Sequence, residues 1–253
     1  MNNKTISAAP CLEGLSLQWH RMTKFQKKMI ALLFLGGCLC MTAAFLTKKH
    51  RSPIAWDGTV FEIDRVNPLD AALAHAYNST IDNIADGFVF VVNALVVVGL
   101  CLRVFQKGGK AEAFAQFFYD GYTFILSWMY TSSFFRLLKT FAGRIRPYMY
   151  FPNPSEKGVL EGDFYRSWPS GHSASAMLAA SFLLCWVLAR KIDAKFQKRL
   201  AAVVLLLALV TMTLRVLSGN HFLTDVISGG VLGFASGSAV FLICNRIAGR
   251  DFA

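Results

Sequence analysis

Long apolar stretches, separated by polar and charged segments, dominate the pattern of this chain. Six apolar runs lie at roughly 29–46, 87–105, 114–135, 173–189, 200–217 and 226–244. Each is close to the length of about 20 residues that an α-helix needs to cross a bilayer. The pattern predicts an all-α fold, a bundle of six transmembrane helices within residues 29–253. Residues 1–28 are polar, end in basic residues, and are interpreted as a cytoplasmic tail.

Two of these segments have a second interpretation. The run 29–46 is also compatible with the core of a secretory signal peptide. Its length and the long polar segment before it favour a retained membrane helix. Between the first two runs, Leu69–Ala85 places apolar residues at helical spacing, and this segment is expected to lie flat at the membrane interface.

The composition agrees with the membrane class. Hydrophobic residues make up 55% of the chain and the mean hydropathy is +0.44, which is too apolar for an ordinary soluble domain. The net charge of +11 would suit a nucleic-acid partner, but no basic stripe interleaved with aromatic residues is present, so none is expected. The six cysteines form no CxxC pair and no metal-type spacing, which argues against a disulfide framework or a zinc site.

The basic residues also predict an orientation. If the N-terminus is cytoplasmic, fifteen of the 26 Lys and Arg residues fall in inside segments and eleven in outside segments. Inside segments normally carry the excess, so we expect both termini inside the cell. The helix ends that carry the candidate chemistry then lie on the external or periplasmic face.

The strongest candidate site lies between the last two runs, in Arg215-x5-His221-x3-Asp225. Charged residues so close to hydrocarbon point to function. Arg215 presents a fixed fork of donors suited to phosphate oxygens, and His221 can act as nucleophile, acid or base near neutral pH. If the stretch is helical, Asp225 shares a face with His221 and can orient its imidazole. The alternative is a chance trio in a loop.

A second candidate lies at the end of the third run, in Lys139-x6-Arg146-Pro147. Lys139 and Arg146 are two helical turns apart and share a face if the helix continues that far. Pro147 disfavours helix at Arg146. The alternative is a cationic helix end that faces lipid headgroups.

A third candidate opens the fourth helix, in Pro169-Ser170-Gly171-His172. A small hydroxyl and free backbone N–H groups at a helix start bind anions. The alternative is an ordinary helix cap with an incidental histidine.

The three stretches fall on the same predicted side of the membrane. Together they supply three cations, two histidines, an aspartate and a helix N-terminus. Histidine with aspartate can indicate a metal, but the three cations would repel one. The set is suited to an anion, and phosphate fits it best.

The three motifs match, in spacing and in order, the signatures of the type 2 phosphatidic acid phosphatase (PAP2) superfamily, and the chain resembles the membrane branch of that family. The resemblance implies that His221 attacks phosphorus and forms a phosphohistidine, with Asp225 orienting it and His172 acting as acid and base. It implies phosphate binding by Lys139, Arg146, Ser170, Gly171 and Arg215. No metal and no cofactor are implied.

The expected activity is hydrolysis of a membrane lipid phosphate or diphosphate. A phosphotransferase on the same fold, passing the phosphoryl group to a second lipid, is the nearest alternative. A six-helix transporter is a different one, but transport sites usually lie near the bilayer midplane, whereas these residues lie at helix ends. The lipid and the oligomeric state are left open.

Two further features have open interpretations. The loop 148–168 is rich in aromatic residues, which are expected either to shape a headgroup entrance or to anchor the loop at the interface. Asp120, near the start of the third run, is interpreted as paired with a neighbouring helix or close to the headgroups, with a functional carboxylate as the alternative.

Overall fold

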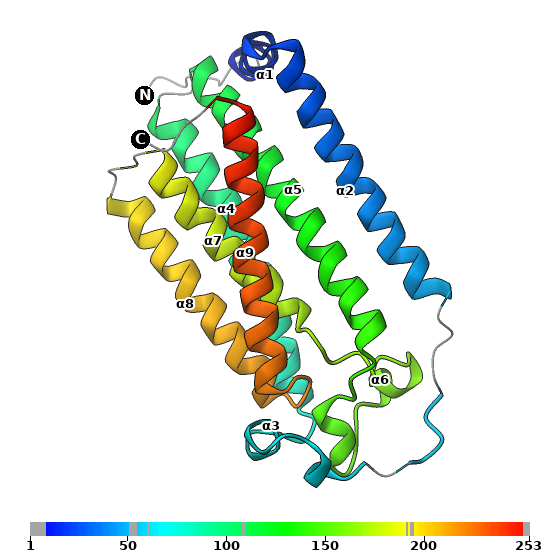
Figure 1. The fold of residues 1–253 in the computed structure, drawn as a ribbon. Helices are drawn as coiled ribbons and strands as arrows, with labels where there is room; N and C mark the ends of the chain where they lie inside the picture. Colours follow the sequence, from blue (N-terminus) through cyan, green and yellow to red (C-terminus); the bar gives the residue numbers. More distant parts are fainter. Residues whose placement is uncertain are drawn as a thin grey trace.

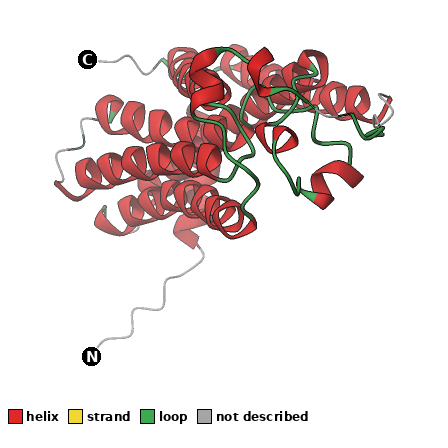
Figure 2. Cartoon of the chain, turned by 90° about the horizontal axis from the view of Figure 1, so that it is seen from below, coloured by secondary structure: helices red, strands yellow, loops and turns green. Residues whose placement is uncertain are grey.

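The computed structural model describes residues 9–50, 55–59, 61–107, 110–190, 192 and 195–249. Over these ranges the chain is helical and contains no β-strand (Figures 1 and 2). Its α-helices are α1 (Ala9–Arg21), α2 (Lys24–His50), α3 (Pro68–Ala72), α4 (Ser79–Gln106), α5 (Ala111–Ala142), α6 (Glu156–Leu160), α7 (Gly171–Ala189), α8 (Lys195–Leu217) and α9 (Leu223–Ile247). Two 3₁₀ turns are η1 (Ile63–Arg65) and η2 (Pro147–Tyr150).

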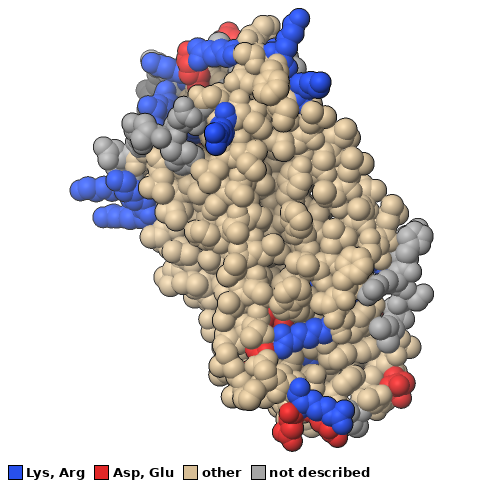
Figure 3. All heavy atoms as spheres, in the orientation of Figure 1, with Lys and Arg blue, Asp and Glu red and all other residues tan. Residues whose placement is uncertain are grey.

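Five of the six expected spans are present as helices long and apolar enough to cross a membrane: α2, α4, α7, α8 and α9. Figure 3 shows a broad uncharged band on the visible face, with Lys and Arg gathered toward the two ends. This surface is what a bilayer requires, because a charged side chain in hydrocarbon is costly. The chain is therefore an integral membrane protein.

The remaining run, 114–135, forms part of α5. This helix has 32 residues, but its most apolar stretch is more polar than those of the other five. Its polar side chains are buried because α5 packs against α2, α4, α7 and α9. The hydroxyls of Thr123, Ser127 and Thr131 donate to backbone carbonyls one turn earlier in the helix, so they are satisfied without water. Asp120 pairs with Arg190 at the end of α7, as the helix-pairing interpretation expected.

α7 lies at the centre of the bundle and α2 at its edge. In their most apolar windows, 61% of α7 is buried but only 11% of α2. The main hydrophobic core surrounds Phe182, Leu183 and Trp186 of α7. α2 is attached to α5 by two tyrosines, since Tyr122 and Tyr130 donate to the carbonyls of Ile30 and Leu33 at 2.7 and 2.8 Å.

The contact between α7 and α9 depends on glycines of α9. A Cβ at Gly233 would lie 1.9 Å from the Ala174 carbonyl oxygen, and one at Gly229 would lie 2.3 Å from the Ser170 carbonyl oxygen. The backbones of the two helices therefore approach more closely than any side chain allows. This contact positions the start of α7 beside the start of α9.

The structure adds detail to one polar segment and corrects the expectation for another. Residues 1–28 contain α1 and the beginning of α2, and α1 packs on the start of α5. The expected interfacial helix 69–85 is not continuous. Only its first residues belong to α3, and the chain turns before α4 begins at Ser79, whose N-cap Asn78 accepts from the Ile81 N–H.

The aromatic loop 148–168 forms a small core of its own. Tyr148, Phe164 and Tyr165 are buried together, against Phe61 and Tyr77 from the segment before α4. These rings therefore hold the loop together by packing against one another. The longer loops gather at this end of the bundle, together with α3 and α6 (Figures 1 and 2).

Gly233→Ala should lower the free energy of unfolding by about 1–3 kcal/mol, because the added methyl forces α7 and α9 apart. The matched control is Gly121→Ala on α5, where a Cβ meets no atom within 4 Å. Heat unfolding of both variants in detergent micelles measures the difference. Equal stability of the two variants would contradict the close contact.

Candidate functional site

The three sequence motifs meet at one end of the bundle, around a cavity of about 510 Å³ that we call the polar cavity. Six of the eight predicted site residues line it: Lys139, Arg146, Gly171, His172, Arg215 and His221. Ser170 and Asp225 lie behind the wall and are fully buried. Residues from four helices and two loops therefore form one site.

Lys139 and Arg146 reach the cavity from two different backbone conformations. α5 ends at Ala142, Gly143 takes a left-handed conformation with φ of 61°, and Arg146 is extended, as Pro147 predicted. The helix does not continue to Arg146, so the two cations do not share a helix face. Lys139 Nζ donates to the Arg166 carbonyl at 2.8 Å, and Arg146 Nη1 donates to the carbonyl and side-chain oxygens of Asn220, both at 3.1 Å.

The start of α7 is capped as the sequence predicted. The Ser170 hydroxyl accepts from the Ser173 N–H at 3.3 Å and lies 2.9 Å from the Ser173 hydroxyl. Gly171 follows on the cavity wall, where a Cβ would lie 2.8 Å from the Phe135 ring. Ser170 thus shapes the helix start, while Gly171 and His172 face the cavity.

His221 and Asp225 approach each other by a route that the sequence did not predict. His221 precedes α9, so the two residues do not share a helix face. Asp225 instead folds back to accept from the Phe222 N–H at 2.9 Å, and its Oδ2 then lies 3.7 Å from His221 Nδ1. This distance permits electrostatic attraction but exceeds a hydrogen bond. His221 Nδ1 is buried and has no hydrogen-bond partner among the described residues.

The surroundings of His221 favour an uncharged imidazole. Its exposed fraction is 1%, and burial lowers the pKa of His221 well below its ordinary value. The positive charges of Lys139, Arg146 and Arg215 lower that pKa further. A neutral ring keeps a lone pair, so His221 is available as a nucleophile at neutral pH.

Arg144 is a central residue that the sequence reasoning missed. Its Nη1 donates to Asp225 Oδ1 at 2.6 Å, and its Nη2 donates to Asp70 Oδ2 at 2.6 Å. Its guanidinium also lies over the Phe222 ring, 4.5 Å from the centroid. Asp70, fully buried in α3, accepts from both the N–H and the hydroxyl of Thr224. Arg144 thereby ties α3 to the start of α9.

Two aspartates on the first turns of α4 were also missed. Asp82 pairs with Arg215, and Asp86 lies 3.4 Å from the same arginine. Asp86 Oδ1 is also 2.7 Å from His172 Nε2. Their spacing of four residues was the available signal, since it places both carboxylates on one helix face. Both residues line the polar cavity, so they counter part of its positive charge.

A comparison with protein families agrees with this geometry. Residues 121–247 match the sequence model of the PAP2 superfamily. No curated protein and no solved structure gives a significant match. The matched range contains all three motifs and every predicted residue around the polar cavity. The chain therefore belongs to the PAP2 superfamily, as a phosphatase-type protein of the membrane.

Proposed function

We propose that this protein hydrolyses the phosphate or diphosphate group of a membrane lipid through a phosphohistidine formed at His221. One observation supports the proposal above all others. A buried, uncharged imidazole lies on the wall of a cavity toward which Lys139, Arg146 and Arg215 converge. Cations that are fixed before substrate arrives stabilise the charge that develops on a transferring phosphoryl group.

Binding begins with exchange of carboxylate for phosphate. Arg215 is paired with Asp82 and Asp86, and its buried Nε has no partner among the described residues. A phosphate monoester that enters the cavity carries up to two negative charges on one group and takes the place of these carboxylates on Arg215. Lys139, Arg146 and the Gly171 N–H then hold the remaining oxygens, with Ser170 fixing the helix start behind them.

The first chemical step forms a P–N bond and breaks the P–O bond to the lipid. Nδ1 of His221 faces Asp225, so Nε2 is the nitrogen that attacks phosphorus. The Asp225 carboxylate balances the positive charge that the ring acquires. His172 protonates the leaving lipid oxygen.

The second step reverses these roles. His172 takes a proton from water, and the water oxygen attacks phosphorus and displaces His221. Free phosphate leaves with the P–N bond broken, and both histidines return to their starting states. Asp86, 2.7 Å from His172 Nε2, holds that ring in position. No metal takes part in either step.

The arrangement of helices supports a lipid substrate. The polar cavity lies at the ends of helices whose outer surfaces are apolar, so a phosphate anchored in the bilayer can reach it from the side. We propose that α5 is the sixth span, because its 32 residues extend about 48 Å, more than the hydrocarbon thickness of about 30 Å. The distribution of Lys and Arg favours an external or periplasmic cavity, with both termini inside.

Purified protein should release phosphate from long-chain lipid phosphates in mixed micelles, also with EDTA present. A water-soluble phosphomonoester should be a much poorer substrate, because only an anchored phosphate is concentrated at the cavity. His221→Ala should abolish release and still fold. Activity that remains in His221→Ala, or that vanishes with EDTA and returns with magnesium, would refute the mechanism.

If a lipid alcohol accepts the phosphoryl group in place of water, free phosphate stays low while a new lipid phosphate appears. Analysis of the products on the same samples identifies this phosphotransferase activity. That outcome would be consistent with a phosphohistidine intermediate but would contradict the proposed hydrolysis.

Arg144→Gln should lower kcat on the order of 100-fold with little change in KM, because Arg144 positions Asp225 and does not line the cavity. Arg144→Lys should restore only part of the rate, since a lysine cannot bind both Asp70 and Asp225 in the same geometry. The matched control is Arg65→Gln, which removes an exposed cation paired with Glu62. A rise in KM alone, with kcat unchanged, would contradict the positioning role.

A further inference from the structure

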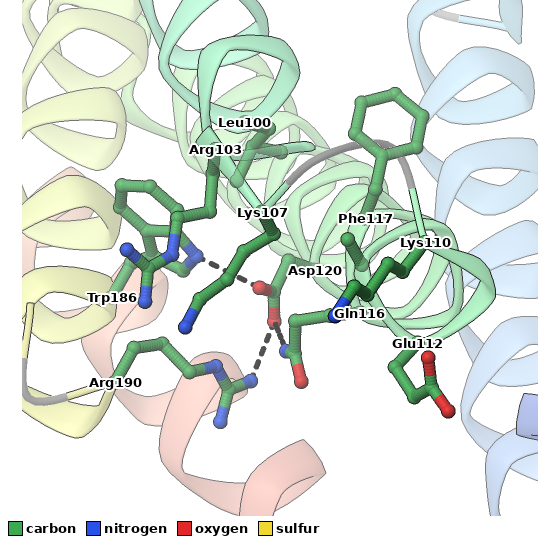
Figure 4. Close-up of a pocket in the computed structure, with 11 residues that line it drawn as sticks. Leu100, Arg103, Lys107, Lys110, Glu112, Gln116, Phe117, Asp120, Trp186 and Arg190 are labelled. Atoms are coloured by element: carbon green, nitrogen blue, oxygen red, sulfur yellow. Dashed lines mark hydrogen bonds and ion pairs between the residues drawn. The ribbon is translucent and has the colours of Figure 1, made fainter. Parts of the chain in front are cut away.

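A second cavity lies at the opposite end of the bundle, between the ends of α4 and α7 and the start of α5. Its volume is about 350 Å³. Four of its lining residues are cations: Arg103, Lys107, Lys110 and Arg190. We call it the basic cavity (Figure 4).

The two acidic residues that line the basic cavity do not pair with Arg103, Lys107 or Lys110. Asp120 is 1% exposed, and its two oxygens accept from Arg190 at 2.5 Å, from Gln116 at 2.8 Å and from Trp186 at 2.8 Å. The Asp120 carboxylate is therefore paired with Arg190 and hydrogen-bonded by two neutral donors. Glu112 is exposed and lies away from Asp120 and Arg190 in Figure 4, and it forms no ion pair with a described residue.

Three cations of the basic cavity thus have no counter-charge within the part of the chain that the structure describes. Within the described ranges, the side chains of Arg103, Lys107 and Lys110 form no ion pair and no hydrogen bond. Arg103 and Lys107 are one turn apart on α4, so their charges repel each other across one helix face. An anion held between them would remove this repulsion.

An unsatisfied donor points to the same conclusion. Nε of Arg190 is buried and has no hydrogen-bond partner among the described residues, although its Nη2 is bound to Asp120. Buried N–H groups normally have partners, so one that lacks a partner beside a cavity indicates an absent acceptor. The side chain of Arg190 is only 13% exposed, which holds this donor in place.

We propose that the basic cavity binds the phosphate group of an anionic ligand, separately from the polar cavity. Guanidinium and ammonium groups around a concave site are the chemistry that recognises phosphate. Two sources share this chemistry, the headgroup of an anionic lipid and free phosphate. Leu100 and Phe117 add an apolar wall to the cavity, next to which the start of a lipid chain would pack. The role that we propose for the basic cavity is ligand binding.

Ligand binding to the folded state raises the unfolding temperature in a concentration-dependent way, which yields a Kd. Three probes are added to the full chain in detergent: dioctanoyl phosphatidylglycerol, dioctanoyl phosphatidylcholine and inorganic phosphate. The test variant is Arg103→Gln/Lys107→Gln. The matched control is Lys24→Gln/Arg246→Gln, which removes the same charge at the same end of the bundle but outside the cavity. The polar cavity is intact in both variants, so its contribution cancels.

The test variant should bind phosphatidylglycerol at least about tenfold more weakly than the control, with phosphatidylcholine unaffected. Weakened binding of phosphatidylglycerol alone identifies a lipid headgroup, whereas weakened binding of inorganic phosphate alone identifies free phosphate. Equal Kd values in the test and control variants would overturn the proposal, as would an equal loss for phosphatidylcholine. If the double variant does not fold, Lys107→Gln replaces it, because Lys107 is exposed. The predicted loss of affinity is then smaller, but phosphatidylglycerol should still be affected and phosphatidylcholine should not.

Discussion

The carboxylate of Asp225 is the group on which both the fold and the chemistry of the polar cavity depend. It closes the start of α9 by accepting from the Phe222 N–H, it accepts from the Ser167 hydroxyl at 2.5 Å, and it binds Arg144. Its distance to His221 Nδ1 is longer, at 3.7 Å. A buried charge is stable only when it is paired and hydrogen-bonded, and these partners meet that need before any substrate is present. The position of His221 is therefore set by a network that also fastens α3 and the loop before α7.

The same physical constraint explains the distribution of charge along the molecule. Hydrocarbon excludes charges, so they collect at the two ends of the bundle, and at each end they surround a cavity (Figure 3). At one end, Asp82 and Asp86 hold Arg215 and His172 in pairs that a phosphate can replace. At the other, Asp120 holds Arg190 alone, and Arg103, Lys107 and Lys110 form no ion pair with a described residue. The glycine contact holds α9 against α7, and α7 contributes residues to the cavities at both ends.

The sequence predicted the helices well because hydrocarbon imposes a simple length and polarity rule. It did not reveal that the polar side chains of α5 are buried against other helices, because that rule describes only contact with hydrocarbon. The three motifs predicted which residues meet at the polar cavity, and six of the eight line it. Arg144 and Asp70 were missed because their partners lie far away in the chain, where no local pattern reveals them. The four-residue spacing of Asp82 and Asp86 places both on one helix face, but it does not reveal their distant partners. The route by which Asp225 reaches His221 was missed for a related reason. Helical spacing was assumed where the backbone instead turns at Phe222.

The central claim is that His221 carries the phosphoryl group during turnover, and rapid-quench labelling tests it most directly. The protein is mixed with a long-chain lipid phosphate labelled with ³²P and quenched in base within one turnover, because a phosphoramidate survives base and is lost in acid. Peptide mapping should then place the label on the peptide that contains His221, and His221→Gln should show none. Label on another residue, or turnover without any bound label at the shortest times, would contradict the account.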